Sequence, residues 1–196
     1  MNGWDESQHP RDEQGRFGEG GGEGGGEGEG GGVAVSGGGA NKAAVQAAVN
    51  AIPKEHLKNA GIASVTVQAT IVNQNGQQIA GLARRYGSGP TEIMVANSVN
   101  GKALKDPTGT ATHEIGHAID NASGLRLSRS MAPTIHADAN KLSAADKYLA
   151  QHYLSNDREL FAELYKLKYS PSKKGAFGMG QKTAEKKFAK SLAAMI

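Results

Sequence analysis

The chain contains no cysteine among its 196 residues. A disulfide framework and a thiolate-bound metal are therefore excluded, and any metal must be held by histidine and carboxylate side chains. Long apolar runs are missing as well, since no stretch approaches the roughly 20 residues that a helix needs to cross a bilayer. Residues 1–14 are polar and acidic and lack an apolar core. The sequence therefore predicts neither a membrane span nor a signal peptide.

Glycine is distributed unevenly along the chain. Residues 18–39 contain 14 of the 28 glycines, interleaved with glutamates, and residues 1–39 carry two basic and eight acidic side chains. A segment of this composition buries too little apolar surface to offset the loss of chain entropy on folding. We therefore expect a disordered acidic tail and linker over residues 1–39, one globular domain over residues 40–170, and a basic extension over residues 171–196.

The basic residues gather near the end of the chain. Eight lysines between residues 166 and 190 are accompanied by a single acidic residue, Glu185. Such a surface can attract nucleic acid or an acidic protein. The lysines do not alternate with aromatic residues, as they do on surfaces that stack nucleic-acid bases. The pattern therefore favours a solvated helix face over a nucleic-acid partner.

Alternating apolar residues indicate short strands. In residues 64–72 apolar and polar side chains alternate, as in a strand that is covered on one side. The dipeptide Asn75-Gly76 is typical of a tight hairpin turn. Two further strands are expected at residues 79–86 and 92–97, and the three strands are predicted to be antiparallel.

Other segments have apolar residues at helical spacing. The first predicted helix follows Asn41 and ends before Pro53. The others are predicted at residues 110–122, 144–153 and 157–169. A further helix over residues 182–195 stays an open question. Strands followed by helices predict an α+β fold.

The motif His113-Glu114-Ile115-Gly116-His117 fits the pattern H-E-x-x-H inside a predicted helix. At 100° per residue the two histidines lie about 40° apart and one turn along the helix, so both imidazoles can bind one cation. Apolar residues occupy the opposite side, so the helix can pack against a core while the histidines face a cleft. Glu114 lies close enough to accept a proton from a metal-bound water. The alternative is an ordinary packed or surface histidine pair.

A catalytic zinc site needs a third protein ligand. The longer pattern H-E-x-x-H-x-x-G-x-x-H is excluded, because Asp120 and Ser123 stand at its glycine and third histidine. Glu159, on a later predicted helix, is the favoured ligand. A capping box between Asn156 and Glu159 would explain this glutamate without a metal. Glu163, one turn further along the same helix, is the reserve ligand.

Four other polar residues are weaker candidates. Asp120 either orients a ligating imidazole or is a plain polar residue at a helix end. His136 and His152 are spare ligands or surface histidines, and His56 is expected to be solvated.

The run from His113 to Asp120, followed by the run from Asn156 to Glu163, resembles the zinc-peptidase domain of the anthrax lethal factor family. The similarity covers about residues 60–169. It implies a zincin-like fold with a small antiparallel or mixed sheet, an active-site helix and further C-terminal helices. The large substrate-docking domains of the toxin have no counterpart, so neither its substrate nor its toxicity carries over.

The resemblance also implies roles for single residues. It assigns Zn²⁺ to His113, His117 and Glu159, and the general base to Glu114. A tyrosine that helps to stabilise the transition state precedes the third ligand in that family. Tyr153 matches it with a spacing to Glu159 that is one residue short.

A second resemblance concerns the first residues of the chain. The segments Trp4-Asp5-Glu6, His9-Pro10-Arg11-Asp12 and Gly15-Arg16-Phe17 are similar to parts of tailed-phage head proteins. This similarity implies a phage-encoded protein in the cytoplasm of a bacterial host or in the virion, with a phage head or another large assembly as partner of the tail. An unremarkable polar tail is the alternative.

The sequence thus predicts a zinc metalloendopeptidase that hydrolyses peptide bonds with a metal-activated water. Glu114 accepts the proton of this water, and an extended protein or peptide substrate is expected to pair with the strand at residues 92–97. The alternative from another class is a non-catalytic structural or interaction protein, such as a virion component, on the same scaffold.

Overall fold

The computed structural model describes residues 33–87, 89–172 and 174–195. Most of the predicted tail, and all residues that carry the phage resemblance, lie outside these ranges. The tail prediction is wrong at its C-terminal end, because Val35–Gly37 forms strand β1 of the central sheet and the Val35 side chain is buried. This short strand is stabilised by its pairing with a neighbouring strand, which its glycine-rich composition does not reveal.

The central sheet has four strands in the order β1-β2-β6-β5. β2 (Ile62–Gln68) pairs in parallel with β1 and with β6 (Thr91–Ala96), whereas β5 (Gly81–Arg85) pairs antiparallel with the other side of β6. The sheet is therefore mixed, and the prediction of three antiparallel strands is wrong for the pair of β2 and β6. β5 forms one edge of this sheet.

The predicted hairpin turn is present, but it joins a separate pair of short strands. Gly76 has a φ of 76°, and β3 (Ile71–Val72) pairs antiparallel with β4 (Gln78–Ile79). Two of the predicted strands are thereby each divided in two. A second short ribbon consists of β7 (Ser98–Val99) and β8 (Lys102–Ala103).

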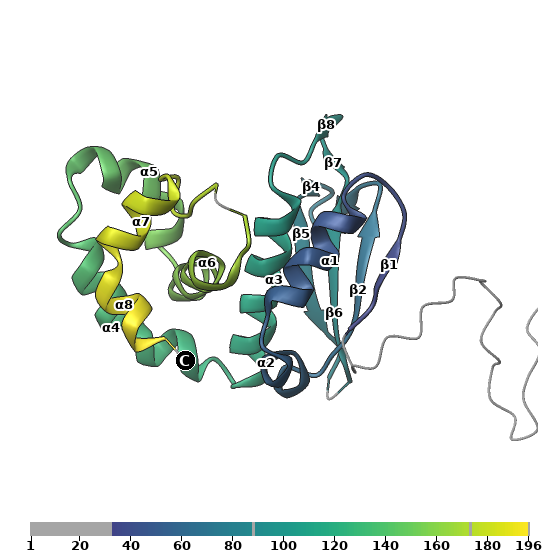
Figure 1. Ribbon diagram of the computed structural model, residues 1–196, viewed down its shortest axis with the longest axis horizontal. Helices are drawn as coiled ribbons and strands as arrows, with labels where there is room; N and C mark the ends of the chain where they lie inside the picture. The colour runs from purple at the N-terminus through teal and green to yellow at the C-terminus, as the bar shows by residue number, and fades with distance from the viewer. Residues whose placement is uncertain (1–32, 88, 173, 196) are drawn as a thin grey trace, which may run out of the picture. The chain divides into compact units, whose positions relative to one another are not determined.

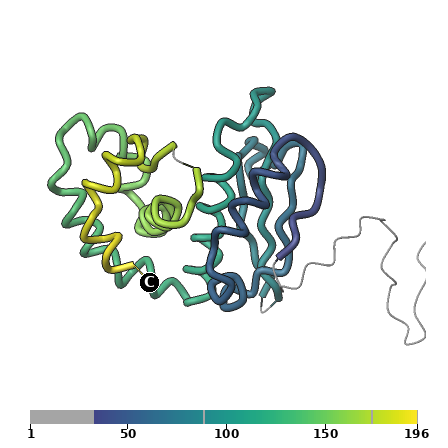
Figure 2. Tube along the Cα trace, in the orientation of Figure 1, coloured from purple at the N-terminus to yellow at the C-terminus, as the bar shows by residue number. Residues whose placement is uncertain are grey.

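Helices make up the rest of the described fold, which is mixed α+β. They are α1 (Lys42–Ala51), α2 (Lys54–Asn59), α3 (Pro107–Ala122), α4 (Arg126–Ala139), α5 (Ala144–Leu154), α6 (Asp157–Tyr169), α7 (Gln181–Lys187) and α8 (Ala189–Ala194). α1 and α3 cover one face of the sheet, and α6 packs against the side of α3 that is turned away from the sheet (Figure 1, Figure 2). Within the described ranges, each helix is too short or too polar to span a bilayer.

The helices predicted at α1, α3, α5 and α6 are confirmed, and the open segment near the C-terminus forms α7 and α8. α5 begins as expected at Ser143, whose hydroxyl accepts a hydrogen bond from the backbone N–H of Asp146 at 3.2 Å. α4 was not predicted, because it contains Pro133 and follows Leu125, which has a φ of 62°. Packing of Met131 and Ile135 into the core stabilises it instead.

Residues 171–196 do not form a separate extension where they are described. The Phe177 and Phe188 rings are fully buried and stacked, with centroids 4.1 Å apart. Met195, near the end of α8, is also buried. These side chains belong to the same core as Phe161 of α6, so the predicted boundary at residue 170 is wrong.

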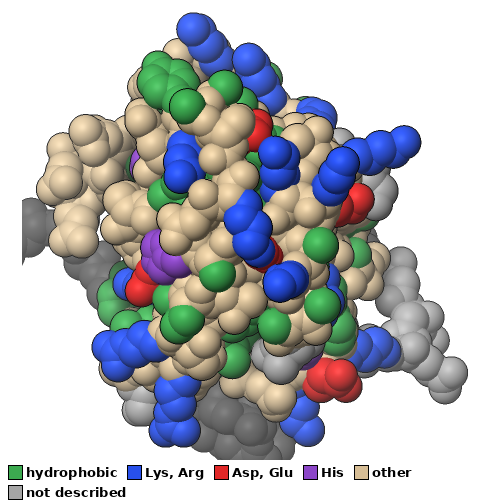
Figure 3. Space-filling view, turned by 90° about the vertical axis from the view of Figure 1, so that its left-hand side faces the viewer, with side chains coloured by type: hydrophobic (Ala, Val, Ile, Leu, Met, Phe, Trp, Pro, Cys, Tyr) green, Lys and Arg blue, Asp and Glu red, His purple; other side chains and the backbone are tan. Residues whose placement is uncertain are grey.

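The helices remote from the sheet carry a basic surface. Figure 3 shows Lys and Arg side chains spread over this face, with fewer Asp and Glu side chains among them. Some of these lysines have acidic partners, since Lys187 lies 3.2 Å from Asp146 and Lys141 lies 3.1 Å from Asp138. A solvated helix face matches this arrangement, and a nucleic-acid partner stays a less favoured prediction.

Candidate metal centre

α3 carries the H-E-x-x-H motif between the sheet and α6. The helix begins after Asp106, whose carboxylate accepts a hydrogen bond from the backbone N–H of Gly109 at 3.0 Å, and Pro107 stands in its first turn. Its buried apolar side chains are Ala111, Ile115, Ala118 and Ile119. The apolar side therefore fixes the helix in the core, as the sequence predicts, and leaves the two histidines at a partly open surface.

α6 delivers the third group. Asn156 caps this helix by accepting a hydrogen bond from the backbone N–H of Arg158 at 3.0 Å. Glu159 is therefore not required for capping, which was the alternative explanation for this residue. Its carboxylate instead contacts His113 and His117 of α3.

The close crossing of α3 and α6 depends on the glycine within the motif. A Cβ atom on Gly116 would lie 3.0 Å from Cα of Ala162 and 3.1 Å from Cβ of Tyr165. Contacts this short leave no space for a larger side chain. Gly116 therefore brings the two helices close enough for their side chains to meet.

The three predicted ligands converge. Glu159 Oε2 lies 3.2 Å from His113 Nε2, and Glu159 Oε1 lies 3.3 Å from His117 Nε2. One donor atom from each of the three residues lies within 4.8 Å of the other two. Two imidazoles and one carboxylate form a donor set that suits a catalytic zinc ion, and all three side chains are partly exposed. The residues present therefore fit a bound metal.

Glu163, the reserve ligand, lies behind His113 instead of beside the other ligands. Its Oε2 is 3.0 Å from His113 Nδ1, and its Oε1 accepts hydrogen bonds from Lys166 Nζ at 3.0 Å and from the backbone N–H of Phe177 at 2.9 Å. The side chain is 2% exposed. Glu163 therefore fixes the orientation of the His113 ring, as residues behind metal ligands commonly do.

The electrostatics of the group follow from these contacts. Burial lowers the pKa of His113, but hydrogen bonds with Glu159 and Glu163 outweigh it and raise the pKa to about 9. Hydrogen bonds with His113 and His117 hold the pKa of Glu159 far below its ordinary range. Glu159 is therefore ionised at neutral pH, as a metal ligand must be.

Glu114 lies on the side of α3 that faces β5. Burial raises the pKa of its carboxyl group, and the neighbouring His113 and His117 partly oppose this rise. The backbone N–H of Ala83 bonds to the carboxylate, and Gly81 leaves the space that the side chain occupies, since a Cβ there would lie 2.7 Å from Glu114 Cγ. β5 thus holds Glu114 in place. The sequence does not reveal this strand-to-helix contact.

Two hollows that share lining residues border the group, with volumes of about 260 and 280 Å³. Both are lined by Gly81, His113, Glu114 and Glu159. Tyr153 lines the first hollow, and burial, followed by the charges of Glu163 and Glu159, raises the pKa of its hydroxyl to about 12. Tyr153 is therefore a neutral hydrogen-bond donor at the edge of the site.

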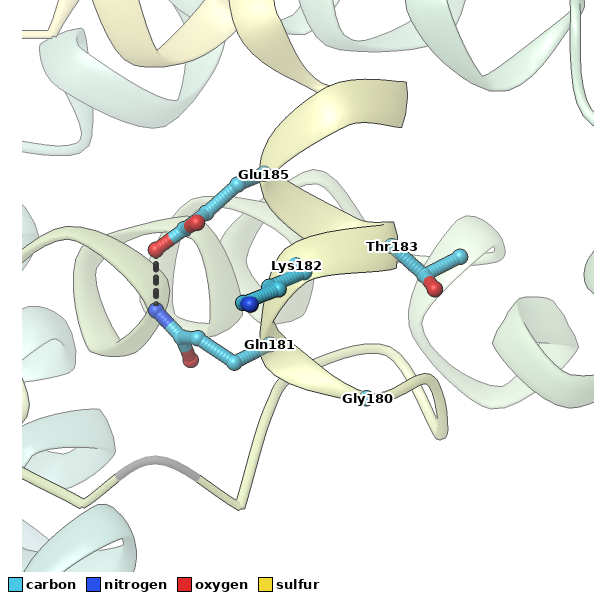
Figure 4. Close-up of a pocket in the computed structure, with 5 residues that line it drawn as sticks. All are labelled: Gly180, Gln181, Lys182, Thr183 and Glu185. Atoms are coloured by element: carbon cyan, nitrogen blue, oxygen red, sulfur yellow. Dashed lines mark hydrogen bonds between the residues drawn. The ribbon is translucent and has the colours of Figure 1, made fainter.

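A wider hollow of about 610 Å³ lies elsewhere, at the beginning of α7. It is lined by Gly180, Gln181, Lys182, Thr183 and Glu185 (Figure 4). Gln181 Nε2 donates to Glu185 Oε1 there at 2.7 Å. None of the candidate metal-binding residues lines this hollow, so it is not part of the site.

The weaker candidates are placed as follows. Asp120 is buried and accepts a hydrogen bond from the backbone N–H of Ser128 at 2.9 Å, so it caps α4. His136 pairs with Asp157 on the surface at 2.8 Å, away from the ligand group.

His152 lines the first hollow beside Tyr153 and does not belong to the ligand group. His56, which is expected to be solvated, is partly exposed, and its Nδ1 lies 2.9 Å from the hydroxyl oxygen of the buried Tyr165.

Comparison of the chain with models of protein families gives no match, and neither does comparison with curated protein sequences. The class of this site is therefore inferred from the residues that form it.

Proposed function

We propose that the protein is a zinc-dependent metallopeptidase with a zincin-like fold that hydrolyses peptide bonds. The observation that carries this proposal is the convergence of His113, His117 and Glu159 at one point, with the partly buried Glu114 beside them. An ion pair made only for stability would not need a fourth, partly buried carboxylate at the same place. The likeness of the motif residues to the anthrax lethal factor family supports the same activity.

His113, His117 and Glu159 would hold the zinc ion, which when bound would supply a Lewis acid for the scissile carbonyl group and for water. Glu114 accepts the proton of the attacking water at its carboxylate and transfers it to the leaving amine. The raised pKa of Glu114 lies closer to neutral pH than the pKa of an exposed glutamate. A pKa near the working pH suits a group that must both accept and release a proton. Tyr153 can donate a hydrogen bond to the developing oxyanion from the edge of the hollow.

The strand beside the site is β5. The prediction that an extended substrate pairs with the strand at residues 92–97 is wrong. That segment is β6, which has paired neighbours on both sides, so it has no free edge for a substrate. The backbone N–H of Ala96 donates to the carbonyl oxygen of Ala80 at 2.9 Å. Because bonded residues alternate in an antiparallel pair, Gly81 and Ala83 direct their backbone groups away from β6. The N–H of Ala83 bonds to the Glu114 carboxylate, so an extended peptide can pair with the backbone groups of Gly81 and the carbonyl oxygen of Ala83 and lie beside Glu114.

The test compares variants of the full chain on an unfolded protein substrate. Glu114→Gln should retain zinc and the melting temperature but lose at least about 100-fold in kcat, because proton transfer is removed. His113→Ala should lose zinc. Glu55→Gln and His136→Ala are the matched controls, since both side chains lie away from the ligand group, and both variants should behave as the parent. Cleavage by Glu114→Gln at the parent rate would refute the mechanism.

A non-catalytic role, such as that of a virion component, is the second candidate. It predicts that the parent binds zinc but cleaves no peptide, with or without a chelator. Chelator-sensitive cleavage by the parent that Glu114→Gln lacks would exclude this candidate.

A further inference from the structure

Phe177 has an unusual backbone conformation. Its φ is 55°, a left-handed value that side chains other than glycine rarely adopt. The residue stands in a tight turn in which Ala176 and Met179 exchange two backbone hydrogen bonds of 3.1 and 2.8 Å. Gly175 and Gly178 on either side of it also have positive φ values, of 91° and 72°. Strain of this kind persists only where the surrounding structure imposes it, and it is common at functional sites.

The backbone of Phe177 reaches the candidate metal centre through one side chain. Its N–H donates to Glu163 Oε1 at 2.9 Å, and Glu163 Oε2 lies 3.0 Å from Nδ1 of His113. The left-handed conformation sets the direction of this N–H. Glu163 is buried, and without the Phe177 N–H its Oε1 would keep only Lys166 Nζ as a partner, so the carboxylate that holds the His113 ring would be less firmly fixed.

The ring of Phe177 reaches a second part of the site. It is fully buried, stacks on Phe188 with centroids 4.1 Å apart, and meets Tyr153 edge to face with centroids 5.8 Å apart. Tyr153 lines the hollow beside His113. The Phe177 ring therefore limits the directions that the Tyr153 ring can take.

We propose that Phe177 is a positioning residue that orients His113 through its backbone N–H and Tyr153 through its ring. The turn that contains Phe177 is then part of the metal centre, although it lies far from the H-E-x-x-H motif in the sequence. The inference about Tyr153 rests on the proposed peptidase function, whereas the inference about His113 requires only metal binding. A purely structural role is the alternative, because a buried phenylalanine also stabilises the core.

The backbone contact is tested with Gly178→Ala. Gly178 has a positive φ, and a Cβ there would lie 3.0 Å from the carbonyl oxygen of Leu149, so the turn must shift. The dissociation constant for zinc, measured by competition with a chromophoric chelator, should rise about tenfold, as when a partner behind a metal ligand is lost.

Gly76→Ala is the matched control for this test. Gly76 has a φ of 76°, nothing lies within 4 Å of its Cβ position, and it belongs to the turn between β3 and β4. The control should cost similar backbone strain and leave zinc affinity unchanged. If Gly178→Ala binds zinc as tightly as the parent, the role of Phe177 toward His113 is overturned. The same holds if Gly178→Ala and Gly76→Ala lose zinc affinity equally.

The ring contact is tested with Phe177→Leu, which keeps the N–H and most of the buried volume. Its zinc affinity should stay within about twofold of the parent, while kcat falls about tenfold at unchanged KM, since Tyr153 acts mainly in the transition state. Phe161→Leu is the control, because Phe161 is also fully buried but lies about 200° round α6 from Glu159. This control should lose melting temperature without losing kcat.

An unchanged kcat in Phe177→Leu, or an equal loss of kcat in Phe161→Leu, would show that Phe177 has only a structural role toward Tyr153. Phe177→Met replaces Phe177→Leu if the latter does not fold. A parent that binds zinc but cleaves no peptide refutes the proposed function. The zinc measurements on Gly178→Ala then still decide whether Phe177 orients His113. A parent that binds no zinc refutes both.

Discussion

Gly81 allows a precise test of how β5 controls Glu114. An added Cβ at this position would lie 2.7 Å from Cγ and 2.8 Å from Oε1 of Glu114, and 2.9 Å from Cγ2 of Thr110. Ordinary van der Waals contacts begin at 3.4 Å. Glu114 has a flexible side chain, whereas Thr110 is β-branched and stiff in a helix, so in Gly81→Ala the displacement falls mainly on the Glu114 carboxylate.

The expected loss of activity follows from this displacement. Restoring normal contact requires a shift of about 0.6–0.7 Å, and since a misplacement of about 1 Å at a reacting group can cost roughly 100-fold in rate, we expect a loss of about 10- to 100-fold. The shift also weakens the hydrogen bond from the Ala83 N–H. The candidate ligands His113, His117 and Glu159 are not among the atoms in conflict, so zinc affinity and melting temperature should change little.

The assay is the cleavage rate of an unfolded protein substrate at saturation, measured together with zinc content by atomic emission. Gly180→Ala is the control, since its Cβ would meet nothing within 4 Å and Gly180 has no positive φ. The reasoning is wrong if Gly81→Ala cleaves as fast as the parent, or if it loses zinc in proportion to activity.

Three further predictions concern the surroundings of the ligands. Glu163→Gln should weaken zinc binding by roughly 10- to 100-fold in a chelator competition, because an amide cannot accept hydrogen bonds at both oxygen positions; unchanged affinity would contradict the role of Glu163. Because the pKa of His113 is raised from 6.5 to about 9 in the folded protein, this group stabilises the metal-free fold fully below pH 6.5, and the contribution is lost as the pH rises through 9. The melting temperature of chelator-treated protein should accordingly fall over that range, and a His113→Ala variant should lack this decrease. Gly116→Ala should lower the free energy of unfolding by about 1–3 kcal/mol in urea titrations, because its Cβ would press on Ala162 and Tyr165 of α6.

The ligand set was predictable because its signals are local. Two histidines one turn apart require only that α3 is helical, and its apolar side makes it so. The prediction of Glu159 also required that a later amphipathic helix packs against α3. The resemblance to a known peptidase family indicated this packing. Spacing alone was also compatible with a capping role for Glu159 and with Glu163 as the ligand.

The parts that the sequence did not reveal depend on contacts between distant segments. The parallel pairing of β2 and β6 and the edge position of β5 are set by the chain path, and no single strand encodes them. α4 contains an internal proline and depends on packing, so its pattern was weak. The burial of Phe177 was missed because the lysines around it dominate the composition of the last residues.

Within the part of the chain that the structure describes, no strand pairs with the outer edge of β5, and this bears on self-association. Unpaired strand edges invite pairing with other chains, so a protein that keeps one exposed has to prevent pairing with its own copies. β5 is only five residues long and ends in Arg84 and Arg85. A strand this short offers few backbone groups to a second copy, and its charged end keeps that edge hydrated, so the edge suits one extended peptide better than stacking of copies.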